Sequence, residues 1–330
     1  MLEDKLTALM GFDTAVIEMG GNPADFLSAN GLEPKDLNNP QLQLPLKALV
    51  EILHHAARKL DKPELGMRIG SAQDFSMLGP AALAILSSKT LMQALYAARS
   101  INVYHNNAEY WRPIVQDQFV YFRRFDLFRQ LPDTRQYKEM SMAACCHLGK
   151  LLLADNFADI TVEFEHSPMS SMERYRRFFP CAVKFNCEQD QLIVPKYLAD
   201  APLPTATPKF QQTLERLEKL EVHELESDFK QQVIVCIQQM MSSGHLSIES
   251  VCEVLAKSKR TLQRRLKEQG TDFKTLLETI RMEKARWYLV SSDIDVTLIS
   301  EIVGYTDVGN FSRAFKRVNG LSPANWRLQN

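Results

Sequence analysis

The fold is decided by two stretches near the end of the chain, SIESVCEVLAKSKRTLQRRLKEQG (residues 247–270) and TLISEIVGYTDVGNFSRAFKRVNG (residues 297–320). In each stretch, a short amphipathic helix leads through a tight turn into a longer helix that is basic on one side and ends at glycine. Residues 272–292, between the two stretches, have the pattern of a single helix. The repeated arrangement predicts two helix-turn-helix units in tandem.

Residues at the expected helix ends support this interpretation. Side-chain oxygens that accept a backbone N–H favour helix starts; we expect Ser247 and Thr297 to cap the short helices, and Ser258 and Asp307 the long ones. Gly270 and Gly320 follow the long helices, where a left-handed conformation is favoured. The connecting helix would be about 30 Å long, close to the roughly 34 Å between successive major-groove faces of B-DNA. The two long helices could therefore enter adjacent major-groove segments.

A helix that reads base edges must bury one face and present polar atoms on the other. At about 100° per residue, the first long helix groups four polar side chains on one side, Arg260, Gln263, Arg264 and Lys267. The second long helix has an apolar stripe of Val308, Phe311, Phe315 and Val318. Across from that stripe lie Asn310, Arg313 and Arg317. We predict that these polar side chains on the two helices contact DNA.

The charge of the chain is unevenly distributed, although its net value is only −1. Residues 230–330 hold 15 Lys and Arg against 10 Asp and Glu, a balance of +5, whereas residues 1–229 hold 24 against 30, a balance of −6. A basic segment in an acidic chain is typical of a nucleic-acid or membrane partner. A single basic helix face is usually just solvated, so it is the repetition of the arrangement that favours DNA.

Length and composition place the chain among ordinary globular proteins. Its 330 residues are enough for two domains, and 45% hydrophobic with 24% charged residues excludes a disordered or collagen-like chain. Neither a long apolar run nor a secretory signal is present, so we expect no membrane span. The six cysteines form no CxxC pair. These features predict a reduced, cytoplasmic protein.

The first two hundred residues show a mixed pattern. Helical periodicity is found at residues 46–60, 91–106 and 135–153, and strand-like patterns at residues 119–125, 161–166, 183–187 and 191–194. Residues 116–118 favour a hairpin turn. Because helices and strands do not strictly alternate, we expect an α+β N-terminal domain followed by an all-α domain with two helix-turn-helix units. The proline-rich stretch 201–208 sets the predicted boundaries: an effector or dimerisation domain at 1–204, a linker at 205–228 and a DNA-binding domain at 229–330.

The aromatic-rich stretch from Tyr104 to Phe128 leaves two interpretations open. It could line an apolar ligand cavity or form a plain sheet core. Likewise Arg123, Arg124 and Arg129 could meet a ligand carboxylate or be solvated. Adjacent residues on a helix cannot chelate a metal together, which argues against a site at His54–His55 or Cys145–Cys146. We find no catalytic or metal-site motif and expect no cofactor.

The C-terminal motifs also resemble a known family. ISEIVGYTDVGNFSRAFKRVNGLSPANWR, residues 299–327, is similar to the signature of AraC/XylS-type transcription regulators, and residues 251–273 resemble the first helix-turn-helix of that family. The resemblance implies base-reading positions at Arg260, Gln263 and Arg264, and at Val308, Gly309, Asn310 and Arg313. Val308 and Gly309 offer no polar side-chain atom. Base reading by the second unit should therefore depend on Asn310 and Arg313.

Residues 44–70 and 78–101 resemble the arabinose-binding-like domain of the ornithine-utilisation-regulator subgroup of this family. The resemblance implies effector binding or dimerisation, and it does not extend to sugar contacts. We therefore expect a non-enzymatic, sequence-specific regulator of transcription, an activator by family resemblance. Its expected partners are double-stranded DNA, RNA polymerase, a small-molecule effector that acts through residues 205–228, and in one arrangement a second copy of the chain. The alternative is a constitutive regulator whose N-terminal domain only dimerises.

Overall fold

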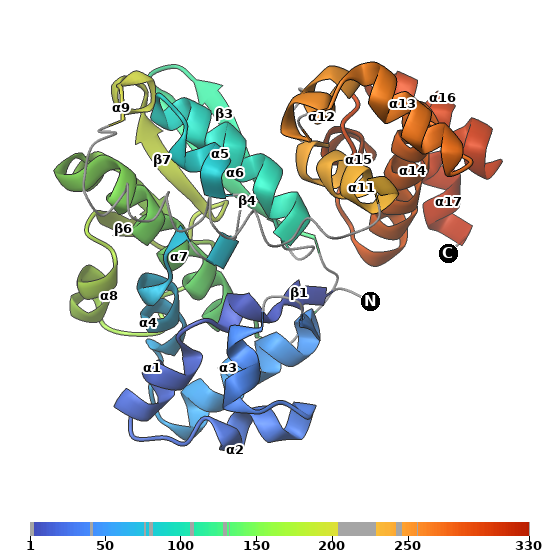
Figure 1. Cartoon of the computed structure of the whole chain (residues 1–330). Coiled ribbons are helices and arrows are strands. Elements are labelled where there is room, and N and C mark those ends of the chain that lie inside the picture. The colour runs from blue at the N-terminus through green and yellow to red at the C-terminus, as the bar shows by residue number, and fades with distance from the viewer. Residues whose placement is uncertain are drawn as a thin grey trace.

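In the computed structural model of this chain, the described buried residues form three hydrophobic cores (Figure 1). One core lies among the N-terminal helices, one between a mixed sheet and the helices beside it, and one within the C-terminal helices. The structure describes residues 3–39, 42–75, 77–78, 82–105, 109–127, 131, 133–203, 229–241, 246–255 and 257–329. No helix within these ranges is long and apolar enough to cross a membrane.

The N-terminal core is formed by a small ribbon and the helices around it. Strand β1 (Glu3–Lys5) pairs antiparallel with β2 (Gln43–Pro45). The helices are α1 (Phe12–Glu18), α2 (Ala24–Leu27), α3 (Leu46–Lys59) and α4 (Leu65–Ala72), with short 3-10 helices at Leu6–Leu9, Ser28–Asn30 and Pro34–Asn38. The helix predicted at residues 46–60 is thus confirmed as α3.

The second core lies against a five-stranded sheet in the order β3-β4-β7-β5-β6. Its strands are β3 (Glu109–Gln116), β4 (Phe119–Asp126), β5 (Thr161–Glu163), β6 (Ala182–Lys184) and β7 (Gln191–Pro195). Neighbouring strands are antiparallel except β5 and β6, which are parallel. The predicted hairpin joins β3 to β4, with Asp117 at φ 52°. The expected strands are confirmed, although β5 and β6 end earlier than residues 166 and 187.

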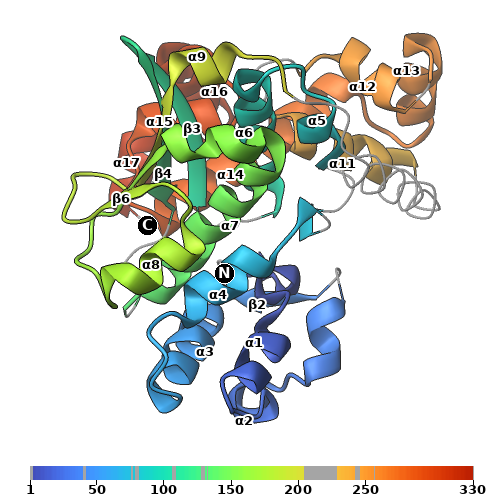
Figure 2. The same ribbon diagram turned by 90° about the vertical axis from the view of Figure 1, so that its left-hand side faces the viewer.

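Helices cover the sheet on one side. They are α5 (Ala82–Leu86), α6 (Leu91–His105), α7 (Arg135–Leu153), α8 (Met172–Phe178) and α9 (Lys196–Asp200), with a 3-10 helix at Ala154–Asp159. The bounds of α7 are those predicted from sequence, and α6 confirms the helix expected from residue 91. Figures 1 and 2 show the sheet between α7 and the C-terminal helices. The mixed architecture confirms the α+β class.

Two glycines allow α4 to pack closely on α7, and this contact joins the first core to the second. A Cβ atom added at Gly70 would lie 2.1 Å from the carbonyl oxygen of Met140, and one at Gly66 would lie 2.2 Å from that of Gln136. Gly66 also donates its backbone N–H to Oε1 of Gln136 at 2.8 Å. Any larger side chain at Gly66 or Gly70 would force the two helices apart.

The C-terminal part is helical throughout its described residues. Its helices are α11 (Phe229–Met240), α12 (Ile248–Val254), α13 (Lys259–Glu268), α14 (Phe273–Ser291), α15 (Val296–Ile302), α16 (Val308–Asn319) and α17 (Pro323–Gln329). The pairs α12–α13 and α15–α16 are the two predicted helix-turn-helix units, and α14 is the predicted connecting helix. The predicted linker at 205–228 lies outside the described residues.

The helix caps agree with the sequence prediction except at one position. Ser247, Ser258 and Asp307 each accept a hydrogen bond from the backbone N–H three residues later, at the starts of α12, α13 and α16. Thr297 was expected to cap α15, but Asp295 is the cap, accepting from Leu298 N at 2.6 Å. The prediction was wrong because α15 begins at Val296, so Thr297 already lies in its first turn. Gly270 and Gly320 have the expected positive φ angles of 71° and 81°.

The core of the C-terminal part confirms one half of the predicted apolar stripe on α16. Phe311 and Phe315 are fully buried, and Phe315 packs edge-to-face on Trp326 with ring centroids 5.8 Å apart. Val308 and Val318 are instead 38% and 45% exposed. They lie at the two ends of α16, beyond the side chains that cover its middle, so α16 is anchored mainly by the two phenylalanines.

Candidate nucleic-acid interface and ligand cavity

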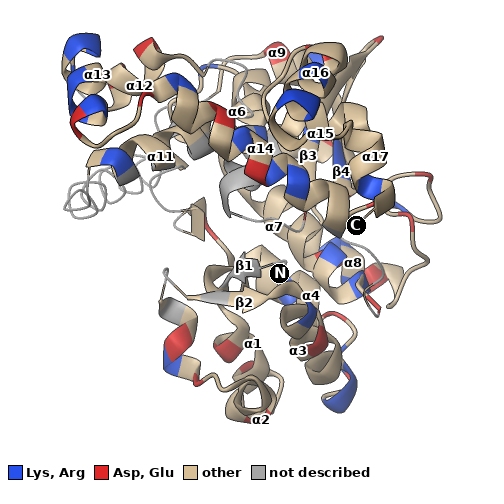
Figure 3. Cartoon of the chain, turned by 90° about the vertical axis from the view of Figure 1, so that its right-hand side faces the viewer, with Lys and Arg blue, Asp and Glu red and all other residues tan. Residues whose placement is uncertain are grey.

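Helices α13 and α16 lie at opposite ends of the C-terminal part, with α14 between them and lysine or arginine on both (Figure 3). All the side chains predicted to contact DNA are exposed: Arg260, Gln263, Arg264, Lys267, Asn310, Arg313 and Arg317. The 19 residues of α14 make it about 28 Å long. The arrangement presents two separate polar faces, each on a helix that is capped and anchored in one core.

On α13, the polar face lies opposite a firmly buried one. Leu262 and Leu266 are fully buried, which fixes the rotation of the helix. Among the described residues, neither Arg260, Gln263 nor Lys267 has a side-chain hydrogen bond or ion pair, whereas Arg264 contacts Glu268 one turn later, with Nη1 and Oε1 3.2 Å apart. That pair is more than half exposed, so it holds Arg264 only weakly. The polar groups of this face are available to a partner.

On α16, the polar side chains are engaged with neighbours. Arg313 donates to Oδ1 of Asn310 at 2.6 Å, which orders the two side chains side by side. A Cβ at Gly309 would lie 3.1 Å from Oδ1 of Asp307, so the glycine leaves room for the carboxylate that caps α16. Arg317 forms an ion pair with Glu278 on α14. To reach DNA, Arg317 must leave that carboxylate.

Basic residues on the connecting helix have structural contacts that sequence analysis did not identify. Arg281 donates to the carbonyl of Gly304 at 2.8 Å and lies over the ring of Tyr305. Burial lowers the pKa of Lys284 to about 7, so this side chain is not a permanent charge. On α13, Arg265 lies over the ring of Phe229, 5.0 Å from its centroid. Arg281 and Arg265 thus join the helices to neighbouring elements rather than form the polar faces.

The two parts of the chain meet at Glu301, near the end of α15. Its carboxylate pairs with Nη2 of Arg99 on α6 at 2.6 Å and with Nη2 of Arg112 on β3 at 3.2 Å. Tyr110 on β3 donates its hydroxyl to the same carboxylate at 3.4 Å, and burial raises the pKa of this phenol. Below we call these residues the Glu301 cluster. No sequence signal predicted it, because its members come from elements far apart in the chain.

Apolar packing continues the contact around the Glu301 cluster. Tyr110 and Leu127, from the sheet, belong to the same hydrophobic core as the C-terminal helices, and α11 packs against α6. The guanidinium of Arg99 lies over the ring of Tyr110, 5.6 Å from its centroid. A change in the position of α6 or β3 would therefore act directly on α15, the first helix of the second unit.

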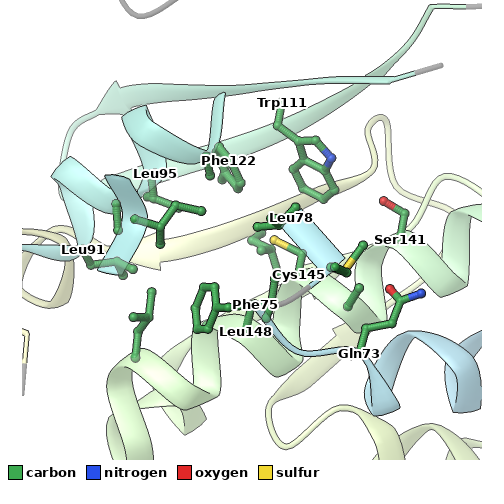
Figure 4. A pocket seen from close by; sticks show the side chains of 18 of the residues that line it. Gln73, Phe75, Leu78, Leu91, Leu95, Trp111, Phe122, Ser141, Cys145 and Leu148 are labelled. Carbon is green, nitrogen blue, oxygen red and sulfur yellow. The ribbon is translucent and has the colours of Figure 1, made fainter. Parts of the chain in front are cut away.

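A cavity of about 140 Å³ lies inside the sheet domain (Figure 4). Its walls come from α6, α7, β3, β4, β7 and the segment after α4, and apolar side chains dominate them, including Phe75, Leu91, Leu95, Trp111, Phe122 and Leu148. Gln73 and Ser141 lie together at one end and Leu91 at the other (Figure 4). The aromatic-rich stretch thus supplies both cavity wall, through Trp111 and Phe122, and inter-domain core, through Tyr110.

Two of the arginines considered as ligand contacts, Arg123 and Arg124, are not among the residues that line this cavity. Arg124 is only 2% exposed and pairs with Glu109 through Nε at 2.6 Å, with Asp126, and more distantly with Asp190 at 3.7 Å. The expectation of a solvated Arg124 is therefore wrong, since the sheet buries it among carboxylates. Arg123 donates to Gln191 on the neighbouring strand. Arg129 lies outside the described residues.

The cysteines and histidines do not form a metal site in the described part of the chain, where no group of three potential ligands comes together. All six cysteines are free thiols. Burial raises the pKa of Cys145, which faces the cavity, to about 12, so its thiol stays protonated near neutral pH.

Two capped helix-turn-helix units on one basic helical module, joined to a separate sheet domain, define a DNA-binding regulator of transcription. Residues 20–203 match the family described as the arabinose-binding domain of AraC transcription regulator, N-terminal, and residues 251–329 match a helix-turn-helix domain family. The chain therefore belongs to the AraC family of transcription regulators, which is not a family of enzymes.

Curated relatives are similar to this chain over nearly its whole length. The HTH-type transcriptional regulator VirS of Mycobacterium tuberculosis is 26% identical over 98% of this chain and 96% of its own. The ornithine utilization regulator of Pseudomonas aeruginosa is 23% identical over 94% and 92%. The solved structure of the transcriptional regulator CdpR from Pseudomonas aeruginosa aligns with 93% of this chain and 96% of its own, at 20% identity and a TM-score of 0.44.

Proposed function

We propose that this protein activates transcription by reading two adjacent major-groove segments with α13 and α16. The observation that carries the proposal is the exposed polar face on each helix, opposite side chains that are fully buried. Arginine can pair with guanine through two hydrogen bonds and a carboxamide with adenine. Arg260, Gln263 and Arg264 would read bases from α13, and Asn310 with Arg313 from α16. Lys267 and Arg317 complete the contact.

The variant Arg264→Ala tests base reading, on an operator obtained by selection from random DNA. We expect a loss of about 1–3 kcal/mol in binding to that operator, with relaxed preference at one base pair. Lys267→Ala is the matched control on the same face; if Lys267 contacts phosphate, affinity falls evenly across sequences and the salt dependence decreases. Equal losses on selected and random DNA for Arg264→Ala would instead make Arg264 a phosphate contact.

We further propose that a small-molecule effector in the sheet domain controls this activity. The support is that β3 faces two ways, with Trp111 lining the cavity and Tyr110 contacting Glu301. On α6, Leu95 lines the cavity one helical turn from Arg99, which pairs with Glu301. Alternate side chains of a strand point to opposite faces, so a ligand that presses on Trp111 also displaces the backbone of its neighbours. An effector that fits one arrangement better would shift the population of the active state.

Transcription in vitro from a promoter next to the selected operator tests this control. In the effector-responsive protein, Glu301→Gln should change both DNA affinity and transcript level several-fold without any ligand, since it weakens the contact that couples the parts. Glu253→Gln, on the exposed side of α12, is the matched control. An unchanged transcript level in Glu301→Gln would favour the alternative, a constitutive regulator whose N-terminal domain only dimerises.

The remaining partners are proposals of the same kind. Activation requires contact with RNA polymerase, and chromosomal DNA together with free thiols agrees with a cytoplasmic location. Dimerisation through the N-terminal domain would appear as a concentration-dependent mass in sedimentation. We also propose the domain limits 1–204 and 229–330, which limited proteolysis can test. Membership of the ornithine-regulator subgroup is a proposal about ancestry only, since the cavity has no paired charges suited to ornithine.

A further inference from the structure

The chemistry of the cavity walls restricts what the effector can be. We propose that this cavity binds a small, uncharged, mainly apolar molecule of single-ring size that donates one hydrogen bond to the end formed by Gln73 and Ser141. This inference rests on the proposed function, since it names the ligand of the domain proposed to sense one.

The size of the cavity sets the size of the ligand. Its volume of about 140 Å³ is close to that of engineered apolar protein cavities of about 150 Å³, which bind benzene. Apolar side chains from the sheet, α6 and α7 surround it, so burying an apolar ring there removes it from water without loss of hydrogen bonds. A sugar carries hydroxyl groups on nearly every carbon, and these walls would leave most of them unpaired.

The polar end of the cavity offers acceptors. Glu109 already accepts from Ser141, from Nε1 of Trp111 at 3.1 Å and from Nε of Arg124 at 2.6 Å. Because the Ser141 proton is used in that bond, its oxygen can only accept from a ligand. Gln73 donates through Nε2 to the carbonyl of Ala8 at 2.8 Å, and among the described residues its Oε1 has no partner. A ligand hydroxyl or N–H would satisfy these acceptors.

The charges near the cavity argue against a charged ligand. A carboxylate would find no cation among the described residues that line the walls, and it would be repelled by Glu109. Arg124 cannot help, because Glu109, Asp126 and Asp190 surround its buried guanidinium. An ammonium would lose its water shell for two neutral acceptors and a carboxylate that three donors already satisfy. An uncharged donor avoids both costs.

Four molecules of nearly the same shape test the proposal on the full-length protein near neutral pH: benzyl alcohol, toluene, benzoate and benzylamine. Calorimetry and the ligand-induced rise in melting temperature give their dissociation constants. We expect benzyl alcohol to bind at least about tenfold more tightly than the two charged molecules and about fivefold more tightly than toluene. Tighter binding of benzoate or benzylamine, or no binding of benzyl alcohol at millimolar concentration, would overturn the proposal.

Two variants locate the binding in the cavity. Ser141→Ala removes one of the two acceptors, so it should reduce the difference between benzyl alcohol and toluene while both still bind, since Glu109 keeps Trp111 and Arg124 as donors. Cys145→Leu adds volume in the cavity wall and should weaken both ligands about tenfold or more, with the melting temperature of the free protein retained. Unchanged binding in both variants would show that the ligands bind elsewhere.

The same ligands separate this inference from the proposed function. Binding of benzyl alcohol without any change in DNA affinity would support the cavity chemistry and contradict effector control. A change in DNA affinity caused by benzoate but not by benzyl alcohol would support effector control and contradict the proposed cavity chemistry.

Discussion

The two parts of this protein present their candidate functional residues in opposite ways. In the C-terminal part, the polar side chains proposed to contact DNA stand on the surface of two regular helices, each opposite a buried apolar side. In the sheet domain, the candidate site is a cavity lined by side chains from several elements far apart in the chain. The first arrangement is periodic in sequence, and the second exists only after folding. The residues of such a surface can therefore be predicted from sequence, whereas those of the cavity can be identified only from the folded structure.

The largest effect on stability should come from the contact between α4 and α7, which joins the first core to the second. Gly70→Ala places a Cβ 2.1 Å from the carbonyl oxygen of Met140, so α4 and α7 must separate. We expect a loss of about 2–4 kcal/mol from the unfolding free energy of the N-terminal part, measured with urea. The neighbouring Ser71→Ala should change it by less than about 0.5 kcal/mol. If the helical part unfolded together with the sheet domain, the two parts would not be independent units.

A buried carboxyl group should make the sheet domain sensitive to pH. Glu139 on α7 is fully buried; burial raises its pKa to about 8, although a hydrogen bond from Tyr175 acts in the opposite sense. The charged groups that act on it are Arg135, which lowers this pKa, and Asp133, which raises it. His166 lies nearby, and burial lowers the pKa of its ring, so that it is mostly neutral near pH 7.

The sign of the pH effect follows from the raised pKa. The folded protein keeps a proton on Glu139 that the unfolded chain releases above its ordinary pKa of 4.5. This stabilisation is complete below that value and is lost as the pH rises through about 8, at up to about 1.4 kcal/mol per pH unit. Glu139→Gln should flatten the dependence of the unfolding free energy on pH over this window. An equally steep dependence in the variant would assign it to other groups.

A smaller effect tests the corrected helix start in the second unit. Asp295→Ala removes the side chain that accepts from Leu298 N, and should lower the unfolding free energy of the helical part by about 1 kcal/mol. Thr297→Ala should change it by only a few tenths, because Thr297 lies within the first turn and alanine is the better helix former. Urea unfolding of both variants decides the matter; an equal loss in both would restore Thr297 as a cap.

The smallest effect concerns the exposed pair on α13. Glu268→Gln removes the ion pair with Arg264, and we expect the unfolding free energy to change by less than about 0.5 kcal/mol. DNA affinity should rise up to a few-fold, since a negative charge near the phosphates is removed and Arg264 is released. Glu253→Gln is the control away from that arginine. A loss above 1 kcal/mol would mean that the pair is structural.

The helical part was largely predictable because each of its signals is local. Ser258 and Asp307 each stand one residue before a helix. Within those helices the buried residues, Leu262 and Leu266 on α13 and Phe311 and Phe315 on α16, are four positions apart. Where the prediction failed, at Thr297, two acceptable caps stood two residues apart, and α15 begins directly after Asp295. Local pattern cannot make that choice.

The sheet domain was predictable only in its elements. The pattern gave α7 with its observed bounds, but not that Gly66 and Gly70 would seat α4 against it. The arginine-rich strand suggested ligand contacts, yet Arg124 is neutralised by carboxylates from β3, β4 and the segment before β7. Such groupings depend on strand register and on residues up to about two hundred positions apart, as at Tyr110 and Glu301.

Along strand β3, side chains that face the cavity alternate with side chains that face α15. Glu109 and Trp111 face inward, whereas Tyr110 and Arg112 face α15. Under the proposed function, exchanging an inward side chain would alter which compound binds, and exchanging an outward one would alter how strongly binding changes DNA affinity. Ligand preference and the strength of the response in DNA binding could thus be changed independently, by substituting alternate residues of a single strand.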